Sequence, residues 1–503
     1  MKRVINLLFA IFVIALIIAV FFIDKNVETM FQNTVKWDNA GYFLLAFILL
    51  CICSWEGDTK EISYKRYKII SILIVVITAV LQGIISRWMP VKILADFSLV
   101  RESAIEIAQG GSLAGKDYFI SFPNNINITV VLSWLYRIFQ DWRWIIFCGS
   151  LLTNLSVLLI SCSVYKISGS TFAALFIEIM GEILLGLTWR AFLPYTDNYG
   201  MVFVALMIFV YFTKIPSKYK IPMIIFCGFA GAFIKATVCV VLLAIAIHAW
   251  MKNIHGLSDL KDNLRRILLI LFCCVICLGV IMKIQTVSRN NIQYEPSSIA
   301  CNWTYYFMLG QNTQAYGMYN DGDSAGIRFQ ILQNYSEDKW NQAFVQEALT
   351  RIKSRGLIGN IQFYLMKINL AYNDGYFHNM RQFTDEDIDK NCLYSFYLDD
   401  ASGLYRIGAD VMQVLWDTIL LLVILDTFLF RKLYSNIDDI FWKVAILGIT
   451  MYLMIFEVRS KYIYMFLPVY MCYGGVIFNR FRMFFSKVIK LDLLKGVDIN
   501  GKN

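Results

Sequence analysis

Long apolar segments dominate this chain and restrict the folds that it can adopt. Thirteen apolar runs can be marked, at 4–23, 40–54, 68–88, 124–140, 144–165, 171–189, 197–213, 221–235, 236–250, 266–284, 409–430, 440–456 and 461–478. A helix that crosses a bilayer needs about 20 residues, so several of these runs are long enough to cross. Only 17% of the residues are charged, whereas soluble domains carry about 25%. The sequence therefore predicts an all-α polytopic membrane protein.

Basic residues lie in clusters between the apolar runs, and their positions predict which side of the membrane each segment faces. Lysine and arginine are enriched in cytoplasmic loops, which also accounts for the formal net charge of +9 without a nucleic-acid partner. The six clusters are Lys2-Arg3, Lys60/Lys65/Arg66/Lys68, Lys214/Lys218/Lys220, Lys252/Lys261/Arg265/Arg266, Arg431-Lys432 and Arg480/Arg482/Lys487/Lys490. If all six are cytoplasmic, both termini lie inside and the number of crossings is even. We therefore expect about twelve transmembrane helices in the cell membrane, with one of the three runs between 124 and 189 not crossing.

This orientation divides the chain into four parts. Residues 1–284 form a transmembrane region that includes an outer loop at 89–123, and residues 285–408 form an extracytoplasmic insert of mixed helix and loop. Residues 409–480 form a second transmembrane region, and residues 481–503 form a cytoplasmic tail. The chain begins with a basic stretch and a long apolar run that lacks a small-residue cleavage site, so we expect a retained helix and not a signal peptide.

Cysteine and histidine do not indicate a metal site or a cofactor. Of the twelve cysteines, only Cys301 and Cys392 fall in the polar insert. These two could form a disulfide if the insert faces an oxidising compartment, and no CxxC motif indicates zinc. The three histidines lack the spacing of metal ligands. We therefore expect no histidine- or cysteine-based metal site, and we expect no cofactor.

A short charged helix is predicted in the outer loop. The stretch "ADFSLVRESAIEIAQGG" (95–111) places Asp96 where a helix begins and a pair of glycines where it ends. Its apolar residues can line one side of a helix over 96–109, next to the membrane. The following stretch "KDYFISFPNN" (116–125) returns the chain to an apolar run through aromatic residues and a proline.

These motifs resemble the GT-C superfamily of polyprenyl-phosphate-dependent glycosyltransferases. The protein O-mannosyltransferase and aminoarabinose–lipid A transferase families have an acid after an early membrane helix, then an amphipathic helix and an aromatic segment with proline. Here these parts are Asp96, "SAIEIAQGG" and "DYFISFP". Three further stretches look like later family motifs: "LPYTDNYG" (193–200) with a second outer Asp, "GAFIKATV" (231–238) and "EVRSKYIYMFLP" (457–468). The families often have Asp-Glu where this chain has Asp96-Phe97, so a second carboxylate must come from Glu102 or elsewhere.

The resemblance implies transfer of a sugar from a polyprenyl-phosphate carrier, with inversion of the anomeric centre, on the extracytoplasmic face. The acceptor would be a cell-envelope glycan, a teichoic acid or a lipid. In such a reaction a carboxylate beside the acceptor can take its proton, and cations balance the charge on the departing phosphate. Asp96 is then the candidate base and Asp197 the second catalytic acid. Both residues could instead serve as helix caps.

The candidate substrate-binding residues are Arg101, Glu102, Tyr118, Tyr195, Lys235, Arg459, Lys461 and Tyr462. Arg459 and Lys461 would bind the phosphate, although cations at helix ends also reach the membrane interface without any ligand. Lys235 interrupts an apolar stretch, where a lysine is costly unless it has a function or a partner. Arg101 and Glu102 could equally form a structural pair, and the three tyrosines could stack on a sugar or pack in the protein.

Other readings of the sequence remain open. A flippase or transporter for lipid-linked saccharides is expected to contain repeats with broken helices, and no repeat is evident. A glycan polymerase or ligase is compatible with the large late insert but usually relies on arginine and histidine there. A pseudoenzyme or receptor is a third alternative. Glu178 and Glu182 lie four residues apart inside an apolar run, where acidic residues often mark a function such as a proton path.

Overall fold

Helices make up all the regular structure of the described part of the chain. The computed structural model describes residues 1–23, 39–55, 61–89, 96–113, 116–253, 260–292, 294–295, 297–377, 392–397, 399, 402–430 and 438–500. Within these ranges no strand is found, as the apolar runs predict. Lys60, Arg431 and Lys432 of the expected basic clusters lie outside the described residues.

Long apolar helices build the body of the protein. Their bounds are α1 (Lys2–Phe22), α2 (Asn39–Ser54), α3 (Tyr64–Trp88), α7 (Trp142–Ser168), α8 (Thr171–Gly181), α9 (Thr196–Phe212), α10 (Ser217–Ile234), α11 (Cys239–Asn253), α12 (Leu260–Asn291), α17 (Gly403–Leu425), α18 (Asp439–Ile455) and α20 (Leu467–Asn500). In the described residues, the helices long and apolar enough to cross a membrane by length and composition are α1, α3, α7, α10, α12 and α17. The predicted polytopic helical membrane protein is confirmed at this level.

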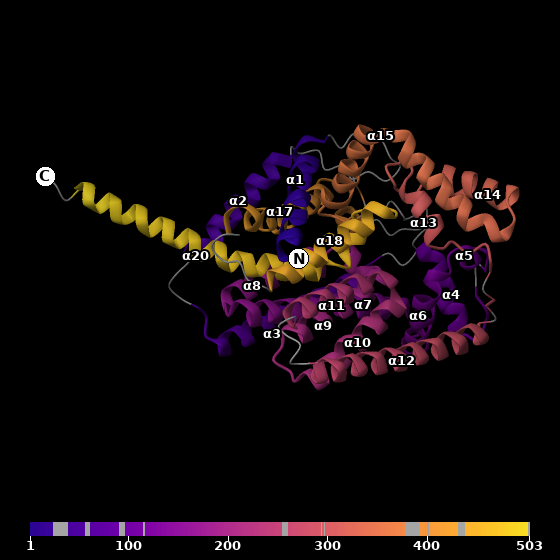
Figure 1. Cartoon of the computed structure of the whole chain (residues 1–503). Coiled ribbons are helices and arrows are strands. Elements are labelled where there is room, and N and C mark those ends of the chain that lie inside the picture. The colour runs from indigo at the N-terminus through magenta and orange to yellow at the C-terminus, as the bar shows by residue number, and fades with distance from the viewer. Residues whose placement is uncertain are drawn as a thin grey trace.

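Several of the remaining helices lie at the end of the bundle opposite the free end of α20 (Figure 1). The remaining elements are α4 (Asp96–Ala108), α5 (Lys116–Ser121), η1 (Pro123–Asn125), α6 (Ile126–Phe139), η2 (Glu182–Gly186), η3 (Trp189–Phe192), η4 (Ala236–Val238), α13 (Trp303–Gly310), η6 (Gly322–Ile327), α14 (Arg328–Asn334), η7 (Glu337–Lys339), α15 (Trp340–Tyr372), α16 (Cys392–Tyr397), η8 (Asp426–Phe430) and α19 (Lys461–Tyr464). Helix α4 matches the helix expected over 96–109. Gly110 follows it with a φ of 88°, a left-handed conformation that glycine adopts without strain.

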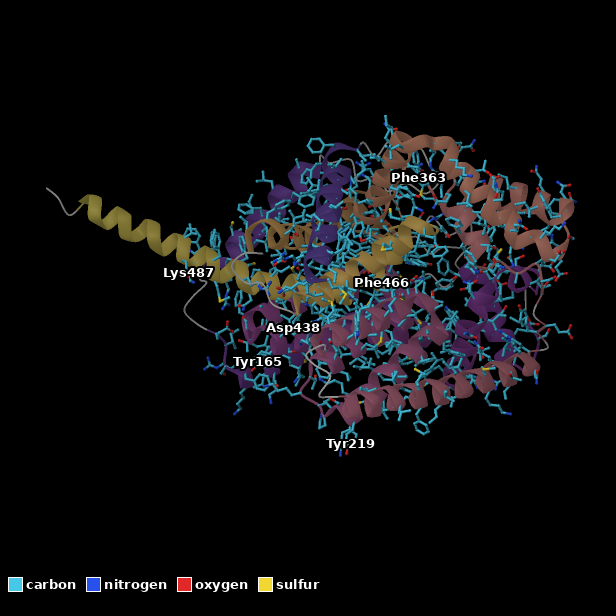
Figure 2. All side chains as sticks on the ribbon, in the orientation of Figure 1. Tyr165, Tyr219, Phe363, Asp438, Phe466 and Lys487 are labelled. Atoms are coloured by element: carbon cyan, nitrogen blue, oxygen red, sulfur yellow. The ribbon has the colours of Figure 1, made fainter. Side chains whose placement is uncertain are left out.

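Helix α20 forms the centre of the bundle. It packs against α7, α8, α17 and α9, and its residues from Leu467 to Phe478 are almost all buried. The ring of Phe478 stacks on Phe176 of α8 with centroids 3.9 Å apart. Figure 2 shows Phe466 inside the bundle just before α20, whereas Tyr219 projects from its edge. The C-terminal half of α20 extends away from the other helices (Figure 1).

Arg480 on α20 is buried in an ionic network and is not part of a free basic patch. Its guanidinium bonds to Asp426 at 3.0 Å and to Asp439 at 2.7 Å. The Tyr473 hydroxyl donates to the same Asp426 at 2.6 Å, and Lys443 lies 3.5 Å from it. The expected C-terminal basic cluster is therefore partly neutralised by acids that the charge pattern did not pair with it.

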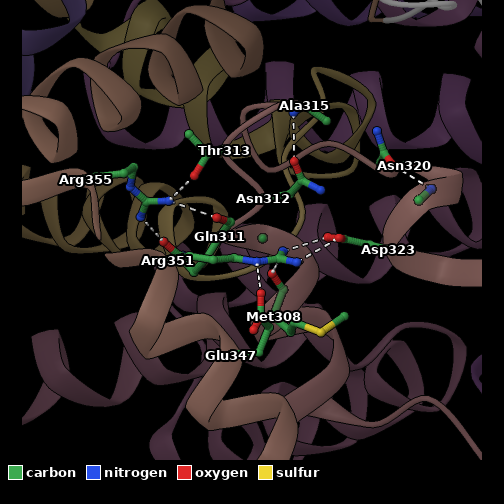
Figure 3. Close-up of polar contacts among 12 residues, drawn as sticks. Met308, Gln311, Asn312, Thr313, Ala315, Asn320, Asp323, Glu347, Arg351 and Arg355 are labelled. Carbon is green, nitrogen blue, oxygen red and sulfur yellow. Dashed lines mark hydrogen bonds and ion pairs between the residues drawn. The ribbon is translucent and has the colours of Figure 1, made fainter. Parts of the chain in front are cut away.

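The insert is held together by arginine side chains. Arg351 on α15 makes two bonds to the Asp323 carboxylate, at 2.7 and 2.8 Å. Arg355, one turn later, donates to the backbone oxygen of Gln311 at 2.8 Å and to its side chain at 2.9 Å (Figure 3). These paired bonds fix α15 against α13 and the chain that follows it. Helix α15 then bends at Gly356, whose φ is 61°.

Lys367 joins the insert to the turn that follows α18. Its Nζ donates to the backbone oxygens of Gly310 at 2.7 Å, Met454 at 3.0 Å and Phe456 at 2.7 Å. These are the three hydrogen bonds that an ammonium can donate. Cys301, also in the insert, is a buried free thiol, so the disulfide considered for it is not present. The side chain of Cys392 lies outside the described residues.

Candidate functional site

Four segments far apart in the sequence meet near the end of the bundle that carries α4 and α5. They are the start of α4, the segment from η3 to the start of α9, the turn between α10 and α11, and the turn from residue 457 to α19. Together they supply Asp96, Arg190, Asp197, Lys235, Arg459 and Lys461, which we call the ionic cluster. Asp96, Asp197, Lys235, Arg459 and Lys461 were among the candidates from the sequence.

Asp197 is the buried anchor of the ionic cluster. Its side chain is in the first turn of α9 and the residue is only 2% exposed. Lys235 Nζ lies 2.5 Å from Asp197 Oδ1, and Arg190 lies 3.7 Å from Oδ2. The carboxylate therefore orients two cations and is not used as a helix cap. Lys461 also acts on Asp197 electrostatically.

Arg190 is held rigidly by backbone contacts. Its Nε donates to the backbone oxygen of Phe377 at 2.7 Å. Asn198, in α9, donates to the backbone oxygens of Arg190 and Ala191 at 2.8 and 2.9 Å. The segment η3 is therefore tied directly to α9, which fixes the position of the guanidinium beside Asp197.

Lys235 reaches the ionic cluster because α10 ends immediately before it. Its backbone is extended, with φ −151° and ψ 113°, and its Nζ lies 5.2 Å from the centre of the Tyr462 ring. Gly231, one turn earlier, lies against α9: a Cβ there would be 2.9 Å from the Cβ of Phe203. The glycine in "GAFIK" thus allows α10 to approach α9 and bring the lysine to Asp197.

Asp96 is connected to the start of α9 through two tyrosines. The Tyr195 hydroxyl donates to Tyr118, and the Tyr118 hydroxyl donates to the Asp96 carboxylate. Asn125 also donates to Tyr118, at 2.5 Å, and the Tyr195 ring packs on Phe97 with centroids 4.4 Å apart. The two candidate acids, Asp96 and Asp197, therefore lie in one region on either side of Tyr195.

Asp96 keeps contact with solvent although protein surrounds its carboxylate. This crowding raises the pKa of Asp96, while Lys461 opposes the rise. Glu457 adds to the rise, and Arg459 opposes it. A carboxylate that is accessible and has a raised pKa is better suited to accept a proton than an ordinary aspartate.

The turn after α18 supplies the remaining cations. Arg459 is 5% exposed, and its Nε lies 3.5 Å from Oε1 of Glu457. Burial, followed by repulsion from Arg459, lowers the pKa of Lys461 to about 8. Lys461 and Lys235 lie at the same distance, 5.2 Å, from the centre of the Tyr462 ring. The Tyr462 hydroxyl donates to Glu457.

The structure adds three residues that the sequence did not single out. Arg190 was hidden in "LTWRAFLP", where a lone arginine among apolar residues is itself a signal that it needs a partner. Glu457 was quoted within a motif without a role, yet it lies among Arg459, Lys461 and Tyr462. Asp374, from the insert, accepts a hydrogen bond from Ser460 at 2.6 Å.

Arg101 and Glu102 have other described partners. The Arg101 guanidinium lies over the Trp142 ring, 5.9 Å from its centre, and interacts electrostatically with Glu102 and Tyr136. Glu102 is exposed on the surface of α4. This arrangement is the structural pair that the sequence offered as the alternative. Among the described residues, no group of three or more His, Cys, Asp or Glu side chains could hold a metal ion.

The ionic cluster combines an accessible carboxylate with several cations. The cations at Lys235, Lys461 and Arg459 can bind an anion such as a phosphate, because hydrogen bonds from charged donors to phosphate oxygens are strong. Asp96 stands beside them and can accept a proton from a neutral group. The arrangement therefore suits an anionic ligand next to a second, proton-donating ligand.

Comparison with known proteins places the chain in a family. The family described as "Conserved hypothetical integral membrane protein" matches residues 1–480. No curated protein and no solved structure matches the chain. The family match extends from α1 into α20 and contains every residue of the ionic cluster. The chain therefore belongs to this family of integral membrane proteins.

Proposed function

We propose that this protein transfers a sugar from a polyprenyl-phosphate carrier to a cell-envelope glycan, teichoic acid or lipid on the extracytoplasmic face of the membrane. The observation that carries the proposal is the convergence of four distant segments on the ionic cluster. Each of these segments contains a motif that resembles one in the GT-C glycosyltransferases. The meeting of these four motifs at one place supports the proposal.

In the proposed reaction, an acceptor hydroxyl attacks the anomeric carbon of the sugar. The bond from that carbon to the phosphate oxygen breaks, and the electron pair leaves with the polyprenyl phosphate. Asp96 takes the proton of the acceptor, because it is the accessible carboxylate of the cluster. Lys461 and Arg459 stabilise the negative charge that grows on the leaving phosphate. Direct displacement of this kind inverts the anomeric centre.

Asp197 acts in this proposal through the cations and not on the substrate. Its burial and its bonds to Lys235 and Arg190 suit a positioning residue that holds both cations in place. Tyr118 has a similar part at Asp96, since its hydroxyl donates to the carboxylate. Tyr462 carries both lysine ammonium groups over its ring and helps to position them.

For the topology, we propose that α6 is the element between 124 and 189 that does not cross the membrane. Helix α6 has 14 residues, and α8 and α11 are similarly short, so the choice rests on packing. Helix α6 packs against α4 of the outer loop. Without α6, the twelve long apolar helices cross, both termini are cytoplasmic, and the ionic cluster faces outward.

The test compares envelope glycans from strains that carry different forms of the chain. A deletion strain is complemented with the wild-type protein, with Asp96→Asn, or with Asp117→Asn, which changes an exposed acid in the same loop. Released glycans and lipids are compared by mass. We expect a sugar to be missing in the deletion strain and with Asp96→Asn, and present with Asp117→Asn. Normal decoration by Asp96→Asn at equal expression would rule out Asp96 as the base.

A further inference from the structure

The buried face of α3 is polar, whereas the buried face of a helix in a soluble protein is usually apolar. The buried residues of α3 are Tyr67, Ser71, Thr78, Gln82 and Ser86. Their spacing of four and seven residues places them on one side of the helix. Its exposed residues are large and apolar, such as those at 69, 72, 73, 76, 80 and 84. A polar face within an apolar helix needs partners inside the protein.

Glu178 on α8 meets this polar face. Ser71 donates to Oε1 of Glu178 at 2.6 Å, and Ser161 of α7 donates to Oε2 at 2.6 Å. The Tyr67 hydroxyl lies 3.0 Å from that of Ser161 and extends the chain of hydroxyls along α3. Glu178 thus has neutral hydroxyl partners.

Glu182 lies one turn after Glu178 and is less well supported by hydrogen bonds than Glu178 is. It is 3% exposed, and neither carboxylate oxygen has a hydrogen bond of normal geometry to any residue that the structure describes. Thr78 and Glu178 are the groups that act on it. It begins the π-helical turn η2, and a Cβ on Gly186 would lie 2.5 Å from Glu182 Oε2.

Among the residues that the structure describes, no cation pairs with either of these two carboxyl groups. In the described part of the chain, the ion pairs found do not include Glu178 or Glu182. A bare carboxylate away from water is far costlier than a protonated one. Two such groups one turn apart cannot both carry a charge there, so at least one must hold a proton.

The polar face continues toward the ionic cluster. Gln82 donates to the backbone oxygen of Gly186 at 2.9 Å, and the Tyr464 hydroxyl donates to that of Leu185 at 3.1 Å. Thr188 donates to the same backbone oxygen of Leu185 at 3.3 Å, and Tyr464 acts electrostatically on Arg190. Polar groups therefore follow one another from Tyr67 to the residues beside Asp197.

We propose that Glu178 and Glu182 form a proton-binding site inside the membrane, which takes up and releases one proton through the polar groups of α3, α7 and α8. Binding forms an O–H bond on a carboxyl oxygen and release breaks it, with no other bond changed. The other titratable groups around the pair are Tyr67 on α3, Cys162 on α7 and Tyr464 on α19. The site does not depend on the proposed sugar transfer.

Infrared spectroscopy of the full-length protein in lipid nanodiscs at neutral pH tests the proposal. A protonated carboxylic acid absorbs in a region free of ionised carboxylates and of amide bands. We expect such a band in the wild-type protein. It should shift in protein labelled with carbon-13 glutamate, which needs no mutation, and it should shift again in heavy water. Glu182→Gln should remove or displace it, whereas Glu337→Gln, which changes an exposed acid, should leave it unchanged.

Two further outcomes decide the question. Absence of a glutamic-acid band in wild-type protein at neutral pH would overturn the proposal, and so would a band that resists heavy water, because the proton must exchange. If Glu182→Gln does not fold, Ser71→Ala removes one hydroxyl from Glu178 and should displace the band. Ser163→Ala is its matched control, because that hydroxyl donates to a backbone oxygen of its own helix at 2.7 Å, whereas Glu178 accepts from Ser71 and Ser161.

Discussion

Lys235 Nζ lies 2.5 Å from Asp197 Oδ1, so a salt bridge joins the turn after α10 to the first turn of α9. Arg190 approaches the same carboxylate from the other side, at 3.7 Å. One buried acid thus holds two cations that come from different segments. A loss of either side of this arrangement leaves buried charge without a partner.

Asp197→Asn is expected to lower the stability of the folded protein. Removal of one partner of a buried ion pair typically costs about 3–5 kcal/mol, because the other charge stays buried and unpaired. The double variant Asp197→Asn/Lys235→Met should regain part of this loss, since the stranded lysine is gone. Thermal denaturation in detergent, followed by size-exclusion chromatography, measures the stability of the single and the double variant. A double variant that is less stable than either single variant would contradict the pairing.

Binding of polyprenyl phosphate is expected to weaken as the pH rises through about 8. The pKa of Lys461 is lowered to about 8, so its ammonium is charged at neutral pH and loses its proton above that value. A phosphate monoester is already mostly doubly charged above about pH 6 and hardly changes in this window. Loss of one charge-assisted hydrogen bond predicts about a tenfold loss of affinity. Titration of the nanodisc-embedded protein with polyprenyl phosphate on both sides of this pH measures the change in affinity.

Lys461→Arg separates this effect from general changes with pH. An arginine stays charged at alkaline pH, so this variant should keep its affinity where the wild-type protein loses it. Lys218→Gln changes an exposed lysine outside the cluster and should follow the wild-type curve. If Lys461→Arg and the wild-type protein lose affinity in parallel, Lys461 is not the titrating phosphate ligand.

Gly310→Ala is expected to disturb the contact between the insert and the turn after α18. A Cβ at Gly310 would lie 2.4 Å from the carbonyl carbon of Phe456 and 2.6 Å from the backbone oxygen of Ile455. Overpacking of this kind costs about 1–3 kcal/mol. Gly279→Ala is the control, because no atom lies within 4 Å of a Cβ there. Equal melting temperatures for the two variants would show that α13 does not pack tightly on that turn.

Sequence reasoning identified cations of the candidate site at positions where a charged side chain is energetically costly without a partner. Lys235 stood out because a lysine inside an apolar stretch needs a partner, and the structure provides Asp197. The identity of that partner depends on how α9 and α10 pack, which local spacing cannot give. Arg190 is likewise a lone charge among apolar residues, but it follows a run already assigned to the membrane. Its position depends on a hydrogen bond to Phe377, which is far away in the chain.

The apolar runs predicted the helical class, but the charge pattern did not predict which charged residues pair inside the protein. Arg480 counted as a cytoplasmic charge, yet it is bonded to Asp426 and Asp439 on two other elements. The polar face of α3 also escaped notice, because its serines and threonine are compatible with an ordinary apolar helix. Only the packing of α7 and α8 turns those residues into a row that faces Glu178.

Lys367 makes the insert and the turn before Glu457 move as one unit. All three of its N–H bonds are committed, to carbonyls on α13, on α18 and at Phe456. A displacement of the insert cannot occur without breaking a charged bond or dragging the backbone next to Glu457. A large molecule that binds and displaces the insert would therefore also displace Phe456, which lies three residues before Arg459 and four before Ser460, the hydrogen-bond donor to Asp374.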